Sequence, residues 1–158
     1  IKAAQSYDKN TGHSYLVSDI TKPLKVEGSF THASIILALQ NLEFPDRAIK
    51  NAAKYLVKGG HFSMIINHPY FRIPRQTSWG IDEAKKLQYR RIDRYLSPLK
   101  IPIQAHPGKL KDSTATISYH WPLESLAKWL KDAGFVIEEI QEWCSNKTST
   151  GSKAKMEN

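Results

Sequence analysis

The chain has 158 residues, of which 41% are hydrophobic and 24% charged, and its formal net charge at pH 7 is +8. This length and composition are typical of one soluble globular domain with a sizeable core. A single cysteine, Cys144, excludes an internal disulfide framework and any metal site made of cysteines alone. No apolar run reaches the roughly 18 residues that a membrane-spanning helix needs, and the first ten residues do not form a signal peptide. We therefore expect a cytoplasmic location and no membrane partner.

The first forty residues predict a short helix and two strands. The range Ile1–Tyr7 has the pattern of a helix end, with Thr11-Gly12 as its stop. The short range His13–Val17 is β-prone and ends at Ser18-Asp19. The apolar range Phe30–Leu39 predicts a buried strand that continues into a loop or a helix.

The middle of the chain has the pattern of a strand–helix–strand unit. Apolar residues in Pro45–Val57 follow the i, i+3/i+4 spacing of a helix, and we expect Gly59-Gly60 to end it. Phe62–Ile66 is a continuous apolar run, which is typical of a strand in a parallel sheet with helices on both faces. This order predicts an α/β fold.

The segment from His68 to Lys111 interrupts this regular order. It contains five of the eight prolines, and ten Lys and Arg residues against three Asp and Glu residues. Most of the positive charge of the chain therefore lies here. Helical potential is confined to the range from Ile81 to about Leu96.

The rest of the chain predicts a strand, a helix, a further strand and a tail. Thr114–His120 is β-prone, and Pro122–Ala133 is an amphipathic helix that should end at Gly134. Phe135–Trp143 predicts another strand. Residues 145–158 are polar and rich in Ser, Thr and Lys, so we expect a flexible tail.

Four short motifs stand where these predicted elements begin or end. They are Phe30-Thr31, Leu37-Ala38-Leu39-Gln40, Leu56-Val57-Lys58-Gly59-Gly60 and Ala133-Gly134-Phe135. In this order and spacing they resemble the class I S-adenosylmethionine-dependent methyltransferases, in particular the methyltransferase type 11-like, small-molecule kind. The resemblance implies a Rossmann-like α/β core with a partial parallel sheet and helices on both faces. It also implies S-adenosyl-L-methionine as the cofactor.

The sequence departs from the family in several places. The family's glycine-rich loop and the acidic residue that binds the ribose hydroxyls are absent, and we expect both to lie upstream of Ile1. The chain also begins with Ile1 and not with Met, so we expect it to be a piece of a longer protein. We accordingly divide it into a partial methyltransferase domain at 1–144, with a lid insertion at about 68–111, and the tail at 145–158.

The resemblance implies five cofactor-binding residues. Asp19 and Ile20 match the adenine-binding position, although Asp19 has the alternative of capping the turn before Thr21. Ile35 and Ile36 match the end of the fourth strand, where the family faces the methyl-donor sulfonium. Gln40 falls where the family often has a polar residue beside the cofactor. For Ile35–Leu39 the alternative is that the side chains simply form core.

The cluster Asn67-His68-Pro69-Tyr70-Phe71 follows directly after a predicted strand. Ligands of open α/β sheets bind outside the carboxyl ends of the strands, and Pro69 directs the chain away from the sheet. His68 and Tyr70 are therefore the candidate catalytic residues, for deprotonating an oxygen or nitrogen nucleophile. Alternatively, His68 holds the following segment through a backbone hydrogen bond.

The predicted lid supplies candidate substrate-binding residues, because a planar guanidinium binds carboxylate and phosphate and aromatic rings can line a pocket. These residues are Arg72, Trp79, Tyr89, Arg90 and Tyr95. On the predicted helix, Arg90 and Arg94 are four residues apart and share a face. The alternative is a solvated basic face that pairs with Asp82, Glu83 and Asp93.

The expected function is direct transfer of a methyl group to an unidentified small molecule, anionic or aromatic. Two alternatives stay open: a nucleic-acid methyltransferase or binder that uses the basic segment 68–111, and a non-catalytic, degenerate methyltransferase fold. The stretch Asn67-His68-Pro69-Tyr70 departs from the Asn/Asp-Pro-Pro-Tyr/Phe signature of methyltransferases that act on nucleic-acid amino groups, which disfavours the first alternative. His106, His120 and Cys144 show no metal-ligand spacing, so no metal site is predicted.

Overall fold

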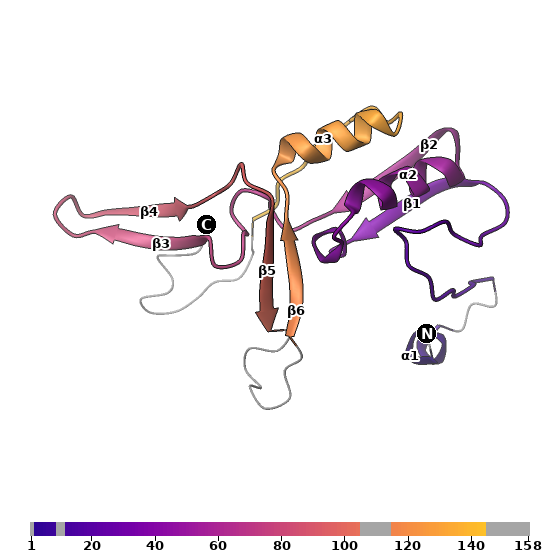
Figure 1. The fold of residues 1–158 in the computed structure, drawn as a ribbon, viewed down its shortest axis with the longest axis horizontal. Coiled ribbons are helices and arrows are strands. Elements are labelled where there is room, and N and C mark those ends of the chain that lie inside the picture. The colour runs from indigo at the N-terminus through magenta and orange to yellow at the C-terminus, as the bar shows by residue number, and fades with distance from the viewer. Residues whose placement is uncertain (1, 9–11, 105–114, 145–158) are drawn as a thin grey trace.

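The computed structural model describes residues 2–8, 12–104 and 115–144, which form three helices, one 3-10 helix and six strands in three separate two-stranded sheets (Figure 1). In chain order the elements are α1 (Lys2–Tyr7), β1 (Phe30–Ile36), η1 (Leu39–Asn41), α2 (Pro45–Tyr55), β2 (Leu56–Ile65), β3 (Thr77–Asp82), β4 (Leu87–Ile92), β5 (Leu99–Gln104), β6 (Ala115–His120) and α3 (Leu123–Asp132).

The predicted strand–helix–strand unit is confirmed as β1, α2 and β2, with the two strands parallel. Helix α2 has Pro45 at its start, Asp46 in its first turn and Lys54 in its last turn. These residue types suit the two ends of a helix, because Pro needs no N–H partner there and the charges oppose the helix dipole. Ile49 on its inner side is fully buried. Helix α2 therefore packs its apolar side on the strand pair, as its apolar spacing predicts.

The glycine pair Gly59-Gly60 has a different role from the predicted one. Helix α2 ends at Tyr55, and Leu56 already has extended dihedrals, so the glycines lie inside β2. The pairing of the two strands shifts there, between Phe30 and His32. A Cβ at Gly60 would lie 3.0 Å from the backbone oxygen of Thr31, so a side chain there would require the neighbouring backbone to shift. The pair thus shapes an irregularity at the start of the strand.

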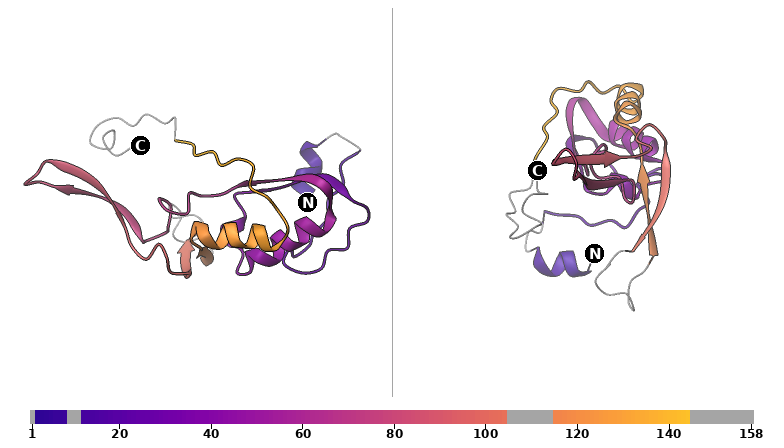
Figure 2. Two further views of the ribbon diagram at one scale, coloured as in Figure 1. Left: turned by 90° about the horizontal axis from the view of Figure 1, so that it is seen from above. Right: turned by 90° about the vertical axis from the view of Figure 1, so that its left-hand side faces the viewer.

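Helices α2 and α3 lie beside each other on one face of the β1–β2 pair (Figure 2). Ile35 of β1, Leu39 of η1 and Leu126 of α3 form the buried centre of this layer. The opposite face of the pair carries His32 and Ile36, both exposed. The prediction of helices on both faces is therefore not met by the described residues, which cover one face only.

The predicted helix from Ile81 to about Leu96 is wrong, because this range belongs to a β-hairpin of β3 and β4 that projects from the rest of the molecule (Figures 1 and 2). Cross-strand pairs override the helical propensity of the range. Arg90 stacks over Trp79 on one face of the hairpin, with 5.1 Å from the guanidinium carbon to the ring centroid. On the other face, the ring of Tyr89 lies against Gly80, where a Cβ would be 2.4 Å from Cζ.

A second apolar cluster holds the base of the hairpin to the β5–β6 pair. Ile73, Leu99 and Ile101 are its buried members, and Ile92 and Tyr95 pack against them. Strands β5 and β6 are antiparallel, and β6 confirms the strand predicted at Thr114–His120 within the residues that the structure describes. The chain then enters α3, which confirms the helix predicted at Pro122–Ala133. Gly134 follows it with a φ of +88°, as expected for a glycine after a helix end.

Two predicted strands are not found. His13–Val17 and Phe135–Trp143 contain no strand, because their backbone groups form no ladder with any described strand. Phe135 is instead held by its side chain, whose ring stacks on Phe62 at 5.3 Å between centroids. The tail predicted at 145–158 lies outside the described residues.

Candidate active site

The carboxyl ends of β1 and β2 lie side by side and open a site at one edge of the parallel pair. Ile36 is paired with Ile65 as the last residue pair of the two strands. The chain therefore leaves the sheet at the same edge twice, once toward Gln40 and once toward His68. This edge is where ligands bind in open α/β sheets.

The turn after β1 has an unusual backbone and leaves one polar atom without a partner. Leu37 has a φ of 48°, which is a strained conformation for a residue with a branched side chain. The Gln40 side chain donates from Nε2 to the Leu37 carbonyl at 2.6 Å. This bond fixes the orientation of the amide, because only its nitrogen can donate. Gln40 Oε1 is consequently a buried acceptor that bonds to no described residue.

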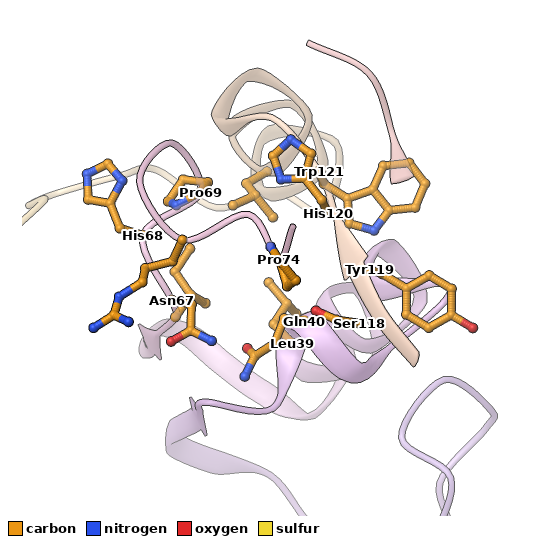
Figure 3. A pocket seen from close by; sticks show the side chains of 13 residues that line it. Leu39, Gln40, Asn67, His68, Pro69, Pro74, Ser118, Tyr119, His120 and Trp121 are labelled. Carbon is orange, nitrogen blue, oxygen red and sulfur yellow. The ribbon is translucent and has the colours of Figure 1, made fainter. Parts of the chain in front are cut away.

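A small pocket of about 50 Å³ lies between this edge and the junction of β6 with α3. Gln40 and Asn67 lie on one side of it, and His120 and Trp121 on the other (Figure 3). Leu39 and Leu126 from the main core and the two prolines Pro69 and Pro74 complete its apolar walls; His68, Arg72, Ser118, Tyr119 and Ile66 also line it. The pocket thus combines a few polar groups with apolar walls, as small-molecule sites do.

His68 uses both of its ring nitrogens within the protein. Nε2 lies 2.5 Å from the Glu142 carboxylate, and Nδ1 accepts the backbone N–H of Tyr70 at 3.1 Å and that of Phe71 at 3.3 Å. Because Nδ1 accepts, the proton of the neutral ring is on Nε2. This geometry matches the alternative role expected for His68, in which the histidine holds the next segment through backbone hydrogen bonds.

Tyr70 and Tyr95 belong to a row of rings beside the pocket. Tyr70 packs edge-on against Tyr95 at 4.8 Å, and Tyr95 in turn lies 5.9 Å from the His120 ring. The Tyr95 carbonyl accepts from His120 Nε2 at 2.7 Å, and its hydroxyl accepts the backbone N–H of Leu123 at 3.1 Å. Both polar groups of Tyr95 are therefore engaged in joining β6 and α3 to the segment after β4.

The remaining predicted substrate-binding residues are not gathered in one place. Arg72 lines the pocket, whereas Trp79, Tyr89 and Arg90 stand on the hairpin, with Tyr89 on the face opposite the other two. Arg90 donates from Nη2 to the Phe71 carbonyl at 2.6 Å, which fastens the hairpin to the segment after β2. The shared helical face expected for Arg90 and Arg94 does not exist, because Arg90 lies in strand β4 and Arg94 lies in the loop after it.

Asp19 and Ile20 lie in a turn that is docked on α2. Asp19 Oδ1 accepts the Thr21 hydroxyl at 2.7 Å and the Thr21 backbone N–H at 3.0 Å. The hydroxyl bond is the main reason that the pKa of the Asp19 carboxyl lies below its usual value. Asn51 of α2 donates to the Ile20 carbonyl at 2.8 Å, and the Ile20 side chain packs on the main core. Asp19 therefore caps this turn through one carboxylate oxygen, which is the alternative role expected from the sequence.

The two isoleucines at the end of β1 differ in environment. Ile35 is buried in the core, whereas the Ile36 side chain is 60% exposed on the open face of the strand pair. A second, larger cavity of about 300 Å³ lies under α2, between Ala33 and Ile49. Its walls are almost wholly apolar, and its Tyr55 hydroxyl already donates to the Leu24 carbonyl at 2.7 Å. The smaller pocket is therefore the better candidate for chemistry.

Sequence reasoning missed the contribution of the β6–α3 junction. Ser118, His120 and Trp121 come from there, and the indole nitrogen Nε1 of Trp121 is a buried donor that bonds to no described residue. The signal is present in the sequence, because Trp121 directly follows the predicted strand Thr114–His120, which ends in a histidine. Within the described parts of the chain, no group of three or more His, Cys, Asp or Glu side chains is arranged to hold a metal ion. In the same parts, no helix has the length and apolar character to cross a bilayer.

Comparison with known proteins finds a likeness among solved structures. No protein-family model matches the sequence, and no curated protein matches it. Among solved structures, the chain is similar to an S-adenosylmethionine-dependent methyltransferase from Mesorhizobium loti, with a TM-score of 0.73 and 28% sequence identity. The match covers 90% of this chain and 62% of that chain, so this chain spans less than two thirds of the neighbour's length. The likeness supports the Rossmann-like α/β fold of the class I methyltransferases for this protein.

Proposed function

We propose that the protein is an S-adenosylmethionine-dependent methyltransferase that methylates a small molecule. The observation that carries the proposal is the likeness to a methyltransferase at a TM-score of 0.73, combined with a polar pocket at the carboxyl edge of β1 and β2. Ligands bind at this edge in Rossmann-like sheets. A type 11-like, small-molecule enzyme is the specific form of the proposal, and it rests on the sequence motifs described above.

The residues at this edge fit the cofactor that the fold implies. The buried Oε1 of Gln40, which bonds to no described residue, is an acceptor that a bound ligand can satisfy, and Ile36 at the end of β1 offers exposed apolar surface. Asp19 Oδ2 pairs with Lys22 Nζ at 3.5 Å, so a ligand amino group that binds there replaces or joins this exposed ion pair. Ile20 and Ile35 pack into the core, so their contribution is made by backbone groups. When bound, S-adenosylmethionine supplies an activated methyl group on a sulfonium.

The chain's own task in such a reaction is to align the substrate and to exclude water. Arg72 stands at the pocket and is suited to an anionic substrate group. The projecting hairpin with Trp79, Tyr89 and Arg90, together with Tyr95 at its base, forms the proposed lid over that substrate. Tyr70 is the proposed catalytic hydroxyl. His68, with both nitrogens engaged, is better suited to orient the Tyr70 backbone than to take a proton.

The proposal is tested by incubating the protein with S-adenosylmethionine that carries a labelled methyl group and with a cell extract separated into small-molecule and RNA fractions. We expect label in the small-molecule fraction, and a strong loss of transfer with Gln40→Ala. Gln141→Ala, at an exposed position outside the pocket, is the matched control. Label in RNA supports the nucleic-acid alternative, which also predicts binding that weakens steeply with salt. No transfer to either fraction supports the degenerate, non-catalytic alternative.

A further inference from the structure

The apolar cavity under α2 takes no part in the proposed reaction. It has a volume of about 300 Å³ and is bounded by α2, by β1 and by the loop 20–26 that precedes β1 (Figure 1). Leu39, which is buried, lines both this cavity and the smaller pocket at the strand edge. Two of its lining residues, Phe30 and Ser34, are exposed, so a small molecule can reach the cavity from solvent.

Small side chains on facing elements leave this space open. Ala33 of β1 and the two alanines Ala48 and Ala52 of α2 stand on its walls, where larger apolar residues would fill it. Ile49, another lining residue, is fully buried, so the space belongs to the interior of the molecule. Protein interiors leave few voids larger than a water molecule, and an empty cavity lowers stability in proportion to its volume. A cavity of this size is therefore a candidate for an occupant.

The loop beside the cavity is held in place by two side chains of α2. Asn51 Nδ2 donates to the Ile20 carbonyl at 2.8 Å and to the Lys22 carbonyl at 2.7 Å. The Tyr55 hydroxyl donates to the Leu24 carbonyl at 2.7 Å. These three hydrogen bonds fix the distance between the loop and the helix, so the loop does not collapse into the space.

The walls suit an apolar molecule better than water or a charged group. The described lining residues include no Asp, Glu, Lys, Arg or His, and none of them has a buried side-chain polar atom without a partner. The donors of Asn51 and Tyr55 are engaged with the loop carbonyls. A buried water needs two to four polar partners, which such walls do not offer. A buried carboxylate or ammonium group would likewise have no partner, at a large cost in free energy.

The volume and the lining set the size and kind of the ligand. Because an apolar cavity of about 150 Å³ stays dry and holds benzene, a cavity of about 300 Å³ has room for about two fused rings. The rings of Phe30, Tyr55 and Phe62 stand among the walls and offer aromatic contacts. We infer that this cavity is a binding site for a small, uncharged molecule built on fused aromatic rings, of the size of naphthalene.

Naphthalene is the probe for the first test, and 2-naphthoate, which adds a carboxylate to the same rings, is its control. Naphthalene should move the ¹³C methyl signals of Ala33, Ala48 and Ala52 in a saturable way and leave that of Ala127, on α3 outside the cavity, in place. 2-Naphthoate should move none of them, because its charge has no partner there. The absence of a saturable shift with naphthalene, or equal shifts with both compounds, overturns the inference. Magnetisation transfer from water to the three methyl groups in the free protein also overturns it, because it shows a hydrated cavity.

The second test asks whether the shifts come from binding inside the cavity. Ala52→Phe places one ring in a space that has room for two, so the shifts of Ala33 and Ala48 with naphthalene should be lost. Ala53→Phe, the same change at the next residue of α2 and outside the lining, is the matched control and should keep them. Ala33→Phe fills the space from β1 and replaces Ala52→Phe if circular dichroism shows that variant to be unfolded.

Shifts at Ala48 that persist in either folded, filled variant overturn the inference. If neither variant folds, the comparison of the two compounds in the unchanged protein decides. Neither test uses the cofactor or a methyl acceptor, so a failure of the proposed function and a failure of this inference are separate results.

Discussion

The turn at Asp19 shows how local hydrogen bonds set the charge of one side chain. The Thr21 hydroxyl bonds to the Asp19 carboxylate and stabilises its charged form, which holds the pKa of Asp19 below its usual value. A carboxyl whose pKa is lower in the folded state than in the unfolded state stabilises the fold above its unfolded pKa. That contribution is lost as the pH falls through the folded pKa.

Thr21→Val should therefore raise the pKa of Asp19 toward its ordinary value without restoring it fully, because the Thr21 backbone N–H still donates. A ¹³C NMR titration of the carboxyl group between about pH 2 and pH 6 measures the midpoint. Thr116→Val, at an exposed position in β6, is the control and should leave the midpoint unchanged. An unchanged midpoint in Thr21→Val would mean that the hydroxyl does not set the charge.

Tyr95→Phe tests the junction between the hairpin base and α3. The change removes the hydroxyl that accepts the Leu123 backbone N–H but keeps the ring between Tyr70 and His120. We expect the free energy of unfolding to fall by about 1 kcal/mol, the usual net worth of one hydrogen bond. Urea denaturation measures it. Tyr70→Phe is the control, because the Tyr70 hydroxyl bonds to no described residue, and an equal loss in both variants contradicts the assigned role of Tyr95.

At the residue scale, the sequence predicts where the candidate site residues lie better than it predicts what their side chains do. It places Gln40, His68 and Arg72 near one strand edge, and the structure brings all three to one pocket. It cannot show that both nitrogens of His68 are engaged, because one partner, Glu142, is 74 residues away in sequence. It also cannot show that the Ile35 side chain faces the core while Ile36 is exposed. Such facts depend on tertiary contacts that no local pattern records.

At the element scale, the β3–β4 hairpin is stabilised by side chains on both of its faces. Gly80 and Tyr89 are directly opposite, and the aromatic ring fills the space that a side chain at Gly80 would occupy. Arg90 and Trp79 form the equivalent pair on the other face. Cross-strand pairs of this kind each contribute about 0.2–1 kcal/mol. The hairpin is therefore expected to be ordered in the free protein, even where it projects into solvent.

Tyr89→Leu tests this packing directly. In the wild type, the Tyr89 ring should shield the α-protons of Gly80, which moves their NMR signals upfield from the usual glycine position. In Tyr89→Leu the signals should return to that position, because the ring is gone. Tyr119→Leu, on β6, is the control and should not affect Gly80. Unshifted Gly80 signals in the wild type would show that the ring does not lie on the glycine.

The elements that the sequence predicts correctly are those with a strong local pattern. Helices α2 and α3 have apolar stripes at helical spacing and clear end signals, and β1 and β6 are short β-prone runs. The sequence predicts a helix in place of the hairpin because Ile81–Leu96 contains many good helix formers. The competing information lies in pairs such as Asp82 with Leu87, and in the turn where Asp82 Oδ1 accepts the Lys85 backbone N–H at 3.1 Å. Such pairs become visible only when the strands are placed together.

At the scale of the whole molecule, the parallel β1–β2 pair and its helices form one body, and two antiparallel pairs extend from it (Figure 1). The candidate site lies where these parts meet, since its residues come from the ends of β1 and β2 and from the β6–α3 junction. This placement makes the basic hairpin a neighbour of the site through Arg90 and Phe71, and not part of its wall. The central claim is therefore that cofactor and substrate meet at the strand edge.

Titration of S-adenosylhomocysteine, the product form of the cofactor, into ¹⁵N-labelled protein is the most direct test of that claim. The account predicts that the changes in amide and side-chain signals cluster at Asp19, at residues 36–40 and at Asn67. Signals of residues 82–87 at the hairpin turn should stay in place. Changes confined to the hairpin would contradict the claim that this strand edge is a methyltransferase site.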